Sequence, residues 1–284
     1  MKSVIDERRA LLVVLIDQDF ERRLLSGKLA EVQVIADGRN SNTAGTALSY
    51  INIIVDSFNS QWRRSHGEAG APVSVSLKVW YNVNLETRWS IVPGLVGTVT
   101  LAEILLLTAM SVAREKEQGT FDQLLVTPFR PAEIVVGKAL SPLLVGVSQA
   151  AVVLLVAVLW FRIPFTGSFL TLYIGITLFL MALVGTGLLL SSVIATMQQA
   201  PLVCFVIALP LLLLSGLFTP LSSMPVILQE FRVINPARYM IDISRRVYLE
   251  GIGLNRLTSD LLPLAATAAL TLSIGAWALG RRLE

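Results

Sequence analysis

The chain has 284 residues, of which 54% are hydrophobic and only 15% are charged, and its mean hydropathy is +0.68. These values exclude an ordinary soluble domain and indicate a membrane protein. The net charge of +3 gives no support for nucleic-acid binding.

The first part of the chain has the patterns of a small α/β domain. Apolar runs and alternation predict three strands, and polar or periodic segments between them predict two helices. In chain order these elements are Ala10–Ile16, Asp17–Ser26, Glu31–Ala36, Leu48–Trp62 and Val73–Asn82. Residues 1–88 are therefore predicted to fold as an α/β domain, and residues 89–284 as a polytopic α-helical membrane domain.

The second part of the chain contains five long apolar runs. A bilayer core about 30 Å thick is crossed by about 20 mostly apolar residues of helix. The predicted spans are Ile91–Val112, Ile134–Phe161, Phe169–Ala195, Pro201–Phe218 and Leu261–Leu279.

The basic residues of the loops give an orientation. The loop Arg114–Lys138 carries four basic residues, which predicts that it lies on the cytoplasmic side. The segment Thr219–Asp260 then lies on the far side, although it carries five arginines. Its periodicity predicts two short helices, at Met224–Val233 and Tyr239–Leu249, partly sunk into the membrane surface and packed on the spans.

The cytoplasmic loop between the first two spans has more structure than a chain reversal needs. Gly119 permits a sharp break, Thr120 and Gln123 form a capping box, and Pro128 stops the short helix that they begin. Two hypotheses fit this amphipathic helix: a docking surface for another protein, or a helix that only floats among the lipid headgroups.

Two sequence blocks resemble the permease subunits of ABC-2 type exporters. The first runs from Glu117-Gln118-Gly119-Thr120 to Thr127-Pro128 and is followed by Gly137-Lys138. The second combines Leu214-Ser215-Gly216-Leu217-Phe218, Met224-Pro225 and Asn235-Pro236-Ala237-Arg238-Tyr239. The blocks occur in the family's order and spacing, and the similarity covers nearly the whole chain.

The resemblance implies a function and a set of partners. In this family a separate ABC ATP-binding subunit docks on the short helix, and two permeases, alike or different, form the pathway. ATP is then used through the partner, with no cofactor bound directly. The expected docking residues are Glu117, Gly119, Thr120, Phe121, Leu124, Leu125 and Pro128. The expected cargo is drug-like or lipid-like, exported across the cell's inner membrane.

The resemblance also implies how the far side is built. Asn235, Pro236, Arg238 and Tyr239 belong to a pair of re-entrant external helices near residues 222–250, which accounts for arginines on that side. The α/β domain matches a subgroup with a large external domain, which recognises a periplasmic adaptor in one hypothesis. Members of that subgroup begin with a cytoplasmic tail and a further span, so the sequence is expected to be incomplete at its N-terminus.

Glu103 is the one acid clearly within a span. A carboxylate near the middle of the bilayer usually faces a cavity or a partner group. One hypothesis places Glu103 on the translocation path. The other, slightly favoured, gives it a packing role through a hydrogen bond to Thr100 or to another span.

The sequence contains no pattern for catalysis or metal binding by this chain alone. Neither Gly27-Lys28 nor Gly137-Lys138 belongs to a phosphate-binding loop, so no nucleotide site is expected. The single Cys204 and the single His66 provide no metal site. Two rivals to transport are a membrane anchor that displays the N-terminal domain as a binding module, and an intramembrane enzyme, for which plausible reactive groups are lacking.

Overall fold

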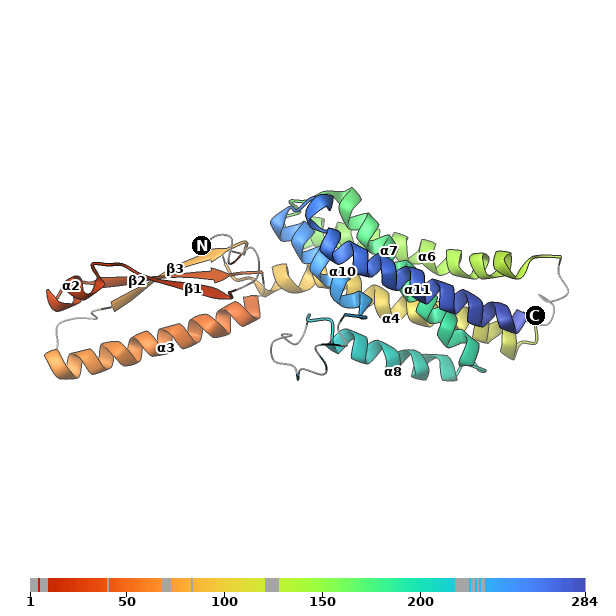
Figure 1. Ribbon diagram of the computed structural model, residues 1–284, viewed down its shortest axis with the longest axis horizontal. Coiled ribbons are helices and arrows are strands. Elements are labelled where there is room, and N and C mark those ends of the chain that lie inside the picture. The colour runs from red at the N-terminus through yellow and green to blue at the C-terminus, as the bar shows by residue number, and fades with distance from the viewer. Residues whose placement is uncertain are drawn as a thin grey trace. The chain divides into compact units, whose positions relative to one another are not determined.

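A computed structural model describes residues 5, 10–39, 41–67, 73–82, 84–120, 128–217, 225, 228, 230 and 233–283. The chain divides into two compact units, Met1–Ser90 and Ile91–Glu284. Figure 1 shows the first as a sheet with a long helix and the second as a bundle of helices. The predicted fold class, a polytopic helical protein with a small N-terminal α/β unit, is confirmed.

The first unit contains a three-stranded mixed sheet. Its elements are β1 (Leu12–Ile16), α2 (Phe20–Leu25), β2 (Ala30–Asp37), α3 (Ser41–His66) and β3 (Val73–Trp80). Strand β2 lies in the middle, antiparallel to β1 and parallel to β3. The predicted order of strands and helices is correct, and the second helix is longer than its apolar stripe because polar residues extend it at both ends.

Helix α3 covers one face of the sheet (Figure 1). Its buried Leu48, with Ile51, Val55 and Trp62, packs against an apolar cluster that includes Val32 and Val34 of β2. Asn59 is 6% exposed and pairs with the backbone of Val73, accepting from its N–H at 3.1 Å and donating to its carbonyl at 2.9 Å. This amide fixes the helix to the first residue of β3.

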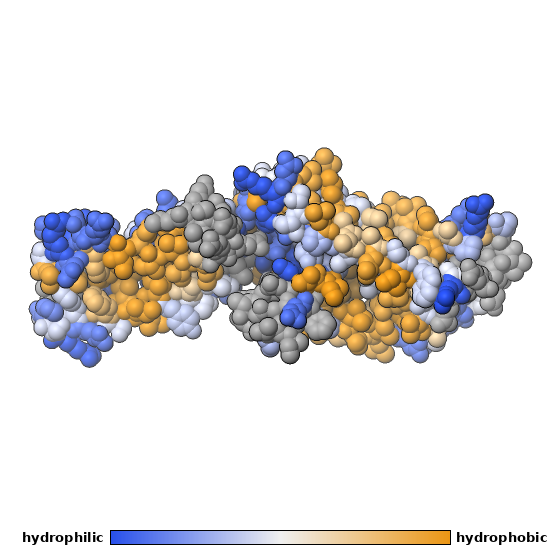
Figure 2. Space-filling model, viewed as in Figure 1, coloured by the Kyte–Doolittle hydropathy of each residue, from blue (hydrophilic) through white to orange (hydrophobic). Residues whose placement is uncertain are grey.

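The second unit is built from helices, four of which are long and apolar. They are α4 (Thr87–Glu117), α6 (Pro131–Leu155), α7 (Phe169–Val193), α8 (Gln199–Leu213), α10 (Pro236–Arg245) and α11 (Thr258–Leu283). Two π-helical turns, Val156–Trp160 and Arg246–Glu250, extend α6 and α10, and a short 3-10 turn, Leu254–Arg256, precedes α11. Hydrophobic side chains cover much of this unit's visible surface (Figure 2), as expected where lipid is the solvent.

Four of the described helices are long and apolar enough to cross a membrane: Ile91–Glu117, Pro131–Trp160, Phe169–Val193 and Thr258–Arg281. The remaining predicted span, Pro201–Phe218, corresponds to the shorter apolar helix α8, which ends at Leu213. Leu214 to Gly216 are in turns, and Gly216 has a positive φ of 81°. The apolar run therefore extends beyond the helix that it forms.

Helix α7 is the centre of the bundle. More than half of its apolar window is buried inside the protein, whereas only 17% of that of α11 is. A Cβ on Gly185 would overlap backbone atoms of Thr271 and Leu272, and one on Gly275 would overlap the Gly185 carbonyl. Thr271 also donates a hydrogen bond of 3.1 Å to the Ala182 carbonyl. The small residues thus let the backbones of α7 and α11 touch, which is typical of packed membrane helices.

We predict that Gly185→Ala destabilises the protein by about 1–3 kcal/mol, because the added methyl overlaps backbone that has little freedom to move away. Gly137→Ala is the matched control, since no atom lies within 4 Å of a Cβ there. The measurement is the thermal unfolding midpoint of each variant in mild detergent. Equal midpoints for the two variants would contradict the close packing.

Candidate functional site

The site begins at the end of α4, where this helix reaches the loop that leads to α6. The helix continues through the charged residues Arg114, Glu115, Lys116 and Glu117 and stops at Gly119, whose φ is +70°. The Gly119 N–H donates to the Lys116 carbonyl at 3.3 Å, which closes the last turn. Glycine suits this position because left-handed backbone carries little penalty without a side chain.

An ion pair joins the end of α4 to the beginning of α6. Glu115 accepts a hydrogen bond from the ammonium group of Lys138, and the two side chains are only 25% and 17% exposed. Lys138 stands two turns inside α6, which begins at Pro131. The two helices that flank the loop are therefore connected directly and not through the loop alone. A partly buried pair of this kind is screened less by salt than a surface pair.

Lys116 joins the end of α4 to the end of α7. Its Nζ donates to the carbonyl of Ser191 at 2.6 Å, to that of Ile194 at 3.2 Å and to that of Ser192 at 3.4 Å. The last carbonyls of a helix have no partner within it and form the negative end of its dipole. The Lys116 ammonium group donates hydrogen bonds to these carbonyls and places a positive charge at the negative end of the dipole. It therefore caps α7 from another span.

Three of the predicted docking residues lie at this junction. The Glu117 carboxylate accepts from the Met197 N–H at 2.6 Å, which holds the turn between α7 and α8. Thr120 donates from its hydroxyl to the Glu115 carbonyl at 3.4 Å, so it turns back onto α4. Gly119, between them, is exposed. Gln123, the partner of Thr120 in the predicted capping box, lies outside the described residues, as do Phe121, Leu124 and Leu125. Pro128 is exposed just before α6.

The opposite end of the bundle holds the second sequence block. Asn235 is 2% exposed; its Oδ1 accepts from the Ala237 N–H at 3.0 Å, and its Nδ2 donates to the Leu211 carbonyl of α8 at 2.8 Å. Pro236 is the first residue of α10, where its missing N–H costs nothing. The Tyr239 hydroxyl donates to the Val233 carbonyl at 2.8 Å, and the Arg238 guanidinium carbon lies 5.3 Å from the Tyr239 ring centre. The block thus ties the start of α10 to α8.

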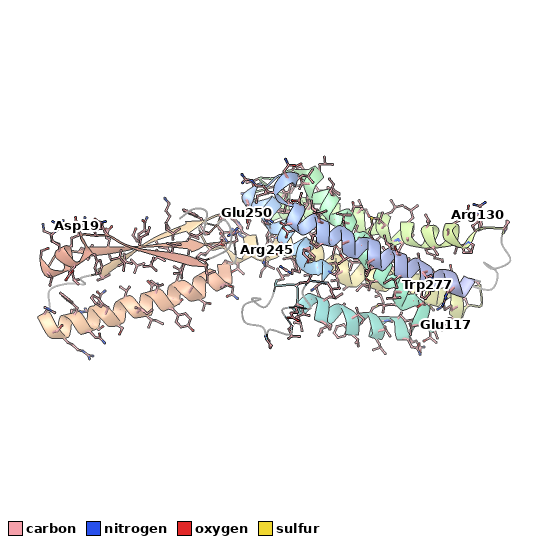
Figure 3. All side chains as sticks on the ribbon, in the orientation of Figure 1. Asp19, Glu117, Arg130, Arg245, Glu250 and Trp277 are labelled. Atoms are coloured by element: carbon pink, nitrogen blue, oxygen red, sulfur yellow. The ribbon has the colours of Figure 1, made fainter. Side chains whose placement is uncertain are left out.

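Arg246, at this end of the bundle, is paired within the protein. Arg246 forms an ion pair with Asp260 and a longer contact of 3.9 Å with Glu250, and it donates to the Arg256 carbonyl at 3.1 Å. Figure 3 places Arg245 and Glu250 at one end of the helical unit and Glu117, Arg130 and Trp277 at the other. The Arg246 charge is thus balanced by carboxylates within the folded segment. The predicted helix Met224–Val233 lies largely outside the described residues.

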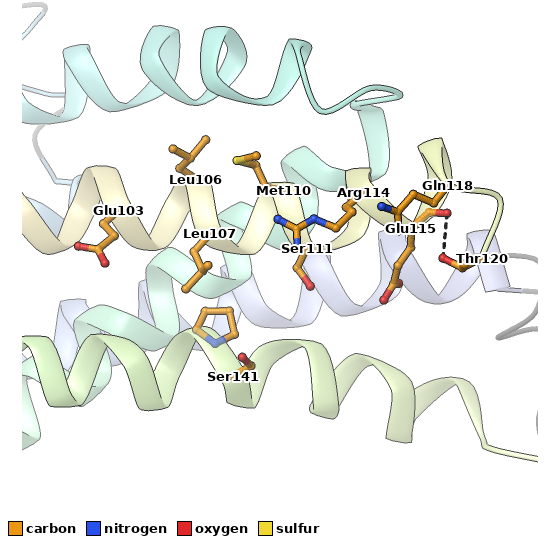
Figure 4. Close-up of a pocket in the computed structure, with 11 residues that line it drawn as sticks. Glu103, Leu106, Leu107, Met110, Ser111, Arg114, Glu115, Gln118, Thr120 and Ser141 are labelled. Carbon is orange, nitrogen blue, oxygen red and sulfur yellow. Dashed lines mark hydrogen bonds between the residues drawn. The ribbon is translucent and has the colours of Figure 1, made fainter.

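A groove runs along α4, between it and α6, and ends at the junction (Figure 4). Its volume is about 520 Å³, and its lining extends from Glu103 past Leu107 and Met110 to Arg114 and Gln118. Glu103 accepts a hydrogen bond from the Gln149 amide of α6. Its partner is thus on another span and is not Thr100, whose hydroxyl donates to Val96 of its own helix.

Among the described residues, no three His, Cys, Asp or Glu side chains come close enough together to hold a metal ion. His66 stacks on Trp62, with the ring centres 3.9 Å apart. Cys204 is buried in α8. The described part of the chain therefore brings together two features. One is the junction of α4, α6 and α7, and the other is the groove lined by α4 and α6.

The model of the ABC-2 family transporter proteins matches residues 1–277. The chain belongs to this family. It is 39% identical over 282 residues to the probable multidrug ABC transporter permease YbhR of Escherichia coli K12, covering 99% of this chain and 76% of that protein. It is 30% identical over 280 residues to YbhS of the same strain, also called a probable multidrug ABC transporter permease, covering 97% and 74% of the two chains. The inner membrane transport permease YhhJ is 30% identical over 270 residues, or 94% and 72%.

The chain is thus a multi-pass membrane permease of the ABC exporters. ABC-2 permeases lack an ATPase domain, so the chain is not itself an ATP-hydrolysing enzyme.

Sequence reasoning missed the contacts that organise the junction. The sequence marks Lys116 as a loop charge and Lys138 as a loop charge within a family block, but it does not show that each binds a group from another helix. Lys116 lies 75 residues from Ser191 in sequence, so no local pattern could pair them. The available signal was the position of each charge within one or two turns of a span's end, where bare helix carbonyls and opposite charges gather.

We predict that Lys116→Met loosens the last turn of α7, because three carbonyls lose an ammonium donor. Hydrogen exchange of the Ile194 amide, which bonds to the Leu190 carbonyl, should quicken about tenfold or more, since such a bond contributes roughly 1.5–3 kcal/mol. Arg114→Met is the control, because Arg114 is exposed on the same helix. Equal exchange in both variants would rule out the cap.

Proposed function

We propose that this chain is the membrane subunit of an ATP-driven exporter and that it passes motion from a separate ATP-binding subunit to its spans. The partner docks on residues 119–128, including Phe121, Leu124 and Leu125. Two permeases form the pathway, and the cargo is drug-like or lipid-like. The setting is the inner membrane, as in the name of YhhJ.

The observation that carries this proposal is the set of contacts beside the loop. Lys138 and Glu115 join α6 to α4, and Lys116 joins α4 to α7. A push on the loop therefore acts on three spans together and not on one flexible connection. A membrane anchor for the N-terminal domain has no use for such a junction, which favours transport over display.

A pair of different permeases is our preferred assembly. YbhR and YbhS come from one strain, and this chain resembles both, at 39% and 30% identity. Two related permeases in one organism supply the two halves of a heterodimer, whereas a homodimer needs only one. We further propose that the N-terminal α/β unit lies on the external side, that the chain belongs to the subgroup with a large external domain, and that this unit recognises a periplasmic adaptor; the small sheet with its covering helix supports the proposal.

We predict that Glu115→Lys or Lys138→Glu alone lowers the number of cargo molecules exported per ATP hydrolysed, because like charges then push α4 and α6 apart. The double variant restores the opposite charges and should recover most of the coupling. The measurement is export and ATP hydrolysis by the complex in proteoliposomes. Additive losses in the double variant would show that the pair does not couple the helices.

Docking is tested by cross-linking in the assembled complex. Phe121→Cys, in a Cys204→Ala background, should cross-link to the ATP-binding subunit. Leu262→Cys is the control, since Leu262 is 70% exposed on α11, which begins at the far end of the bundle. Failure of every position from 119 to 128 to cross-link, with the complex intact, would exclude this docking surface.

A further inference from the structure

The groove between α4 and α6 has an apolar middle and two polar ends. We call the end at Glu103 the upper end and the charged end at Arg114 and Glu115 the lower end. Glu103 and Arg114 are separated by about 16 Å along the helix, at 1.5 Å of rise per residue. Leu106, Leu107 and Met110 lie between them, and Ser141 and Pro142 of α6 form the opposite wall. The volume of about 520 Å³ falls within the range typical of small-molecule sites.

The spacing on α4 gives the groove a single face. Positions 103, 107, 110, 114 and 118 recur every three or four residues, so they follow one side of the helix. Glu103, Leu107 and Glu115 point from α4 towards α6 (Figure 4). Leu107, in the middle of the lining, is 37% exposed, so the groove is open to its surroundings there.

The charge at the upper end is not balanced. Glu103 lies well inside the span Ile91–Glu117, and it accepts a hydrogen bond from the neutral Gln149 amide. Among the described residues, no lysine, arginine or histidine forms an ion pair with it. The other carboxylate of the groove, Glu115, already has Lys138. A carboxylate at this depth is costly, and an incoming positive charge would reduce that cost.

We propose that this groove is the entry site for organic cations with an apolar body, and that Glu103 selects for their positive charge. This inference rests on the proposed export function and names its substrate class. The cationic centre lies at Glu103, and the apolar body lies along Leu107 and Met110. Gln149 orients the carboxylate through its amide. An anionic amphiphile is excluded from the upper end, because it would bring a second negative charge beside Glu103.

The test is protection of a cysteine in the groove, with no ATP-binding subunit present. Leu107→Cys is introduced with Cys204→Ala in the purified full chain in lipid nanodiscs, and its labelling by a maleimide is timed. Tetraphenylphosphonium is the probe, and tetraphenylmethane, which has a similar shape and no charge, is its matched control. Leu262→Cys on α11 reports any general effect of the probes on the bilayer.

We expect the cation to slow labelling at Leu107→Cys about tenfold more than the neutral compound does, and neither to protect Leu262→Cys. Adding Glu103→Gln should abolish this difference, Glu103→Asp should keep most of it, and Glu230→Gln, at an exposed position outside the groove, should keep all of it. A charge contact of about 1.4 kcal/mol corresponds to that tenfold ratio.

Three results would overturn the inference: equal protection by both probes, protection that survives Glu103→Gln, or a Leu107→Cys that reacts with no label because another polypeptide segment covers the groove. Export by the assembled complex is measured separately with any transported dye. Loss of the binding result with export intact refutes the entry site alone, whereas absence of export from the wild-type complex refutes the proposed function.

Discussion

The structure depends on a constraint that every bundle of membrane helices has to meet: helix ends carry unpaired carbonyls and partial charges that lipid does not satisfy. Here one charged turn at the end of α4 meets that constraint for its neighbours. Lys116 caps α7, Glu117 holds the turn that follows α7, and Glu115 pairs with Lys138 of α6. The contacts that stabilise the bundle are therefore the same contacts that connect its spans beside the loop.

This arrangement explains how a small loop can act on a large membrane domain. The α7–α11 interface is close-packed at Gly185 and Gly275, so α11 is bound to α7 through backbone contact. In the function proposed above, motion delivered to α4 would reach α7 through the Lys116 contacts and then α11 through that interface. On the far side, Asn235 links α10 to α8, so the two ends of the bundle are each fixed by a few polar side chains. Interfaces of this kind move as units and are not continuously deformable.

The sequence predicted the elements better than their contacts. The second and third strands of the first unit followed from alternation at Glu31–Ala36 and Val73–Asn82, and four spans followed from apolar length alone. The run Pro201–Phe218 was apolar enough but forms a shorter helix, because turn formation at Leu214 to Gly216 is not encoded in hydropathy. The partners of Lys116 and Glu103 come from other helices, so neither composition nor periodicity could identify them. The family blocks located the junction without revealing what binds what.

The central claim is that the ends of α4 and α6 move as one body when the partner binds ATP. Spin labels at Gln118→Cys and Ala132→Cys, in a Cys204→Ala background, measure the distance across the two helix ends in the assembled complex. Pulsed electron resonance should give the same distance between positions 118 and 132 with and without nucleotide. The distance from position 118 to the equivalent aligned position in the second permease, labelled in a separate experiment, should change. A change in the first distance on ATP binding would contradict the account.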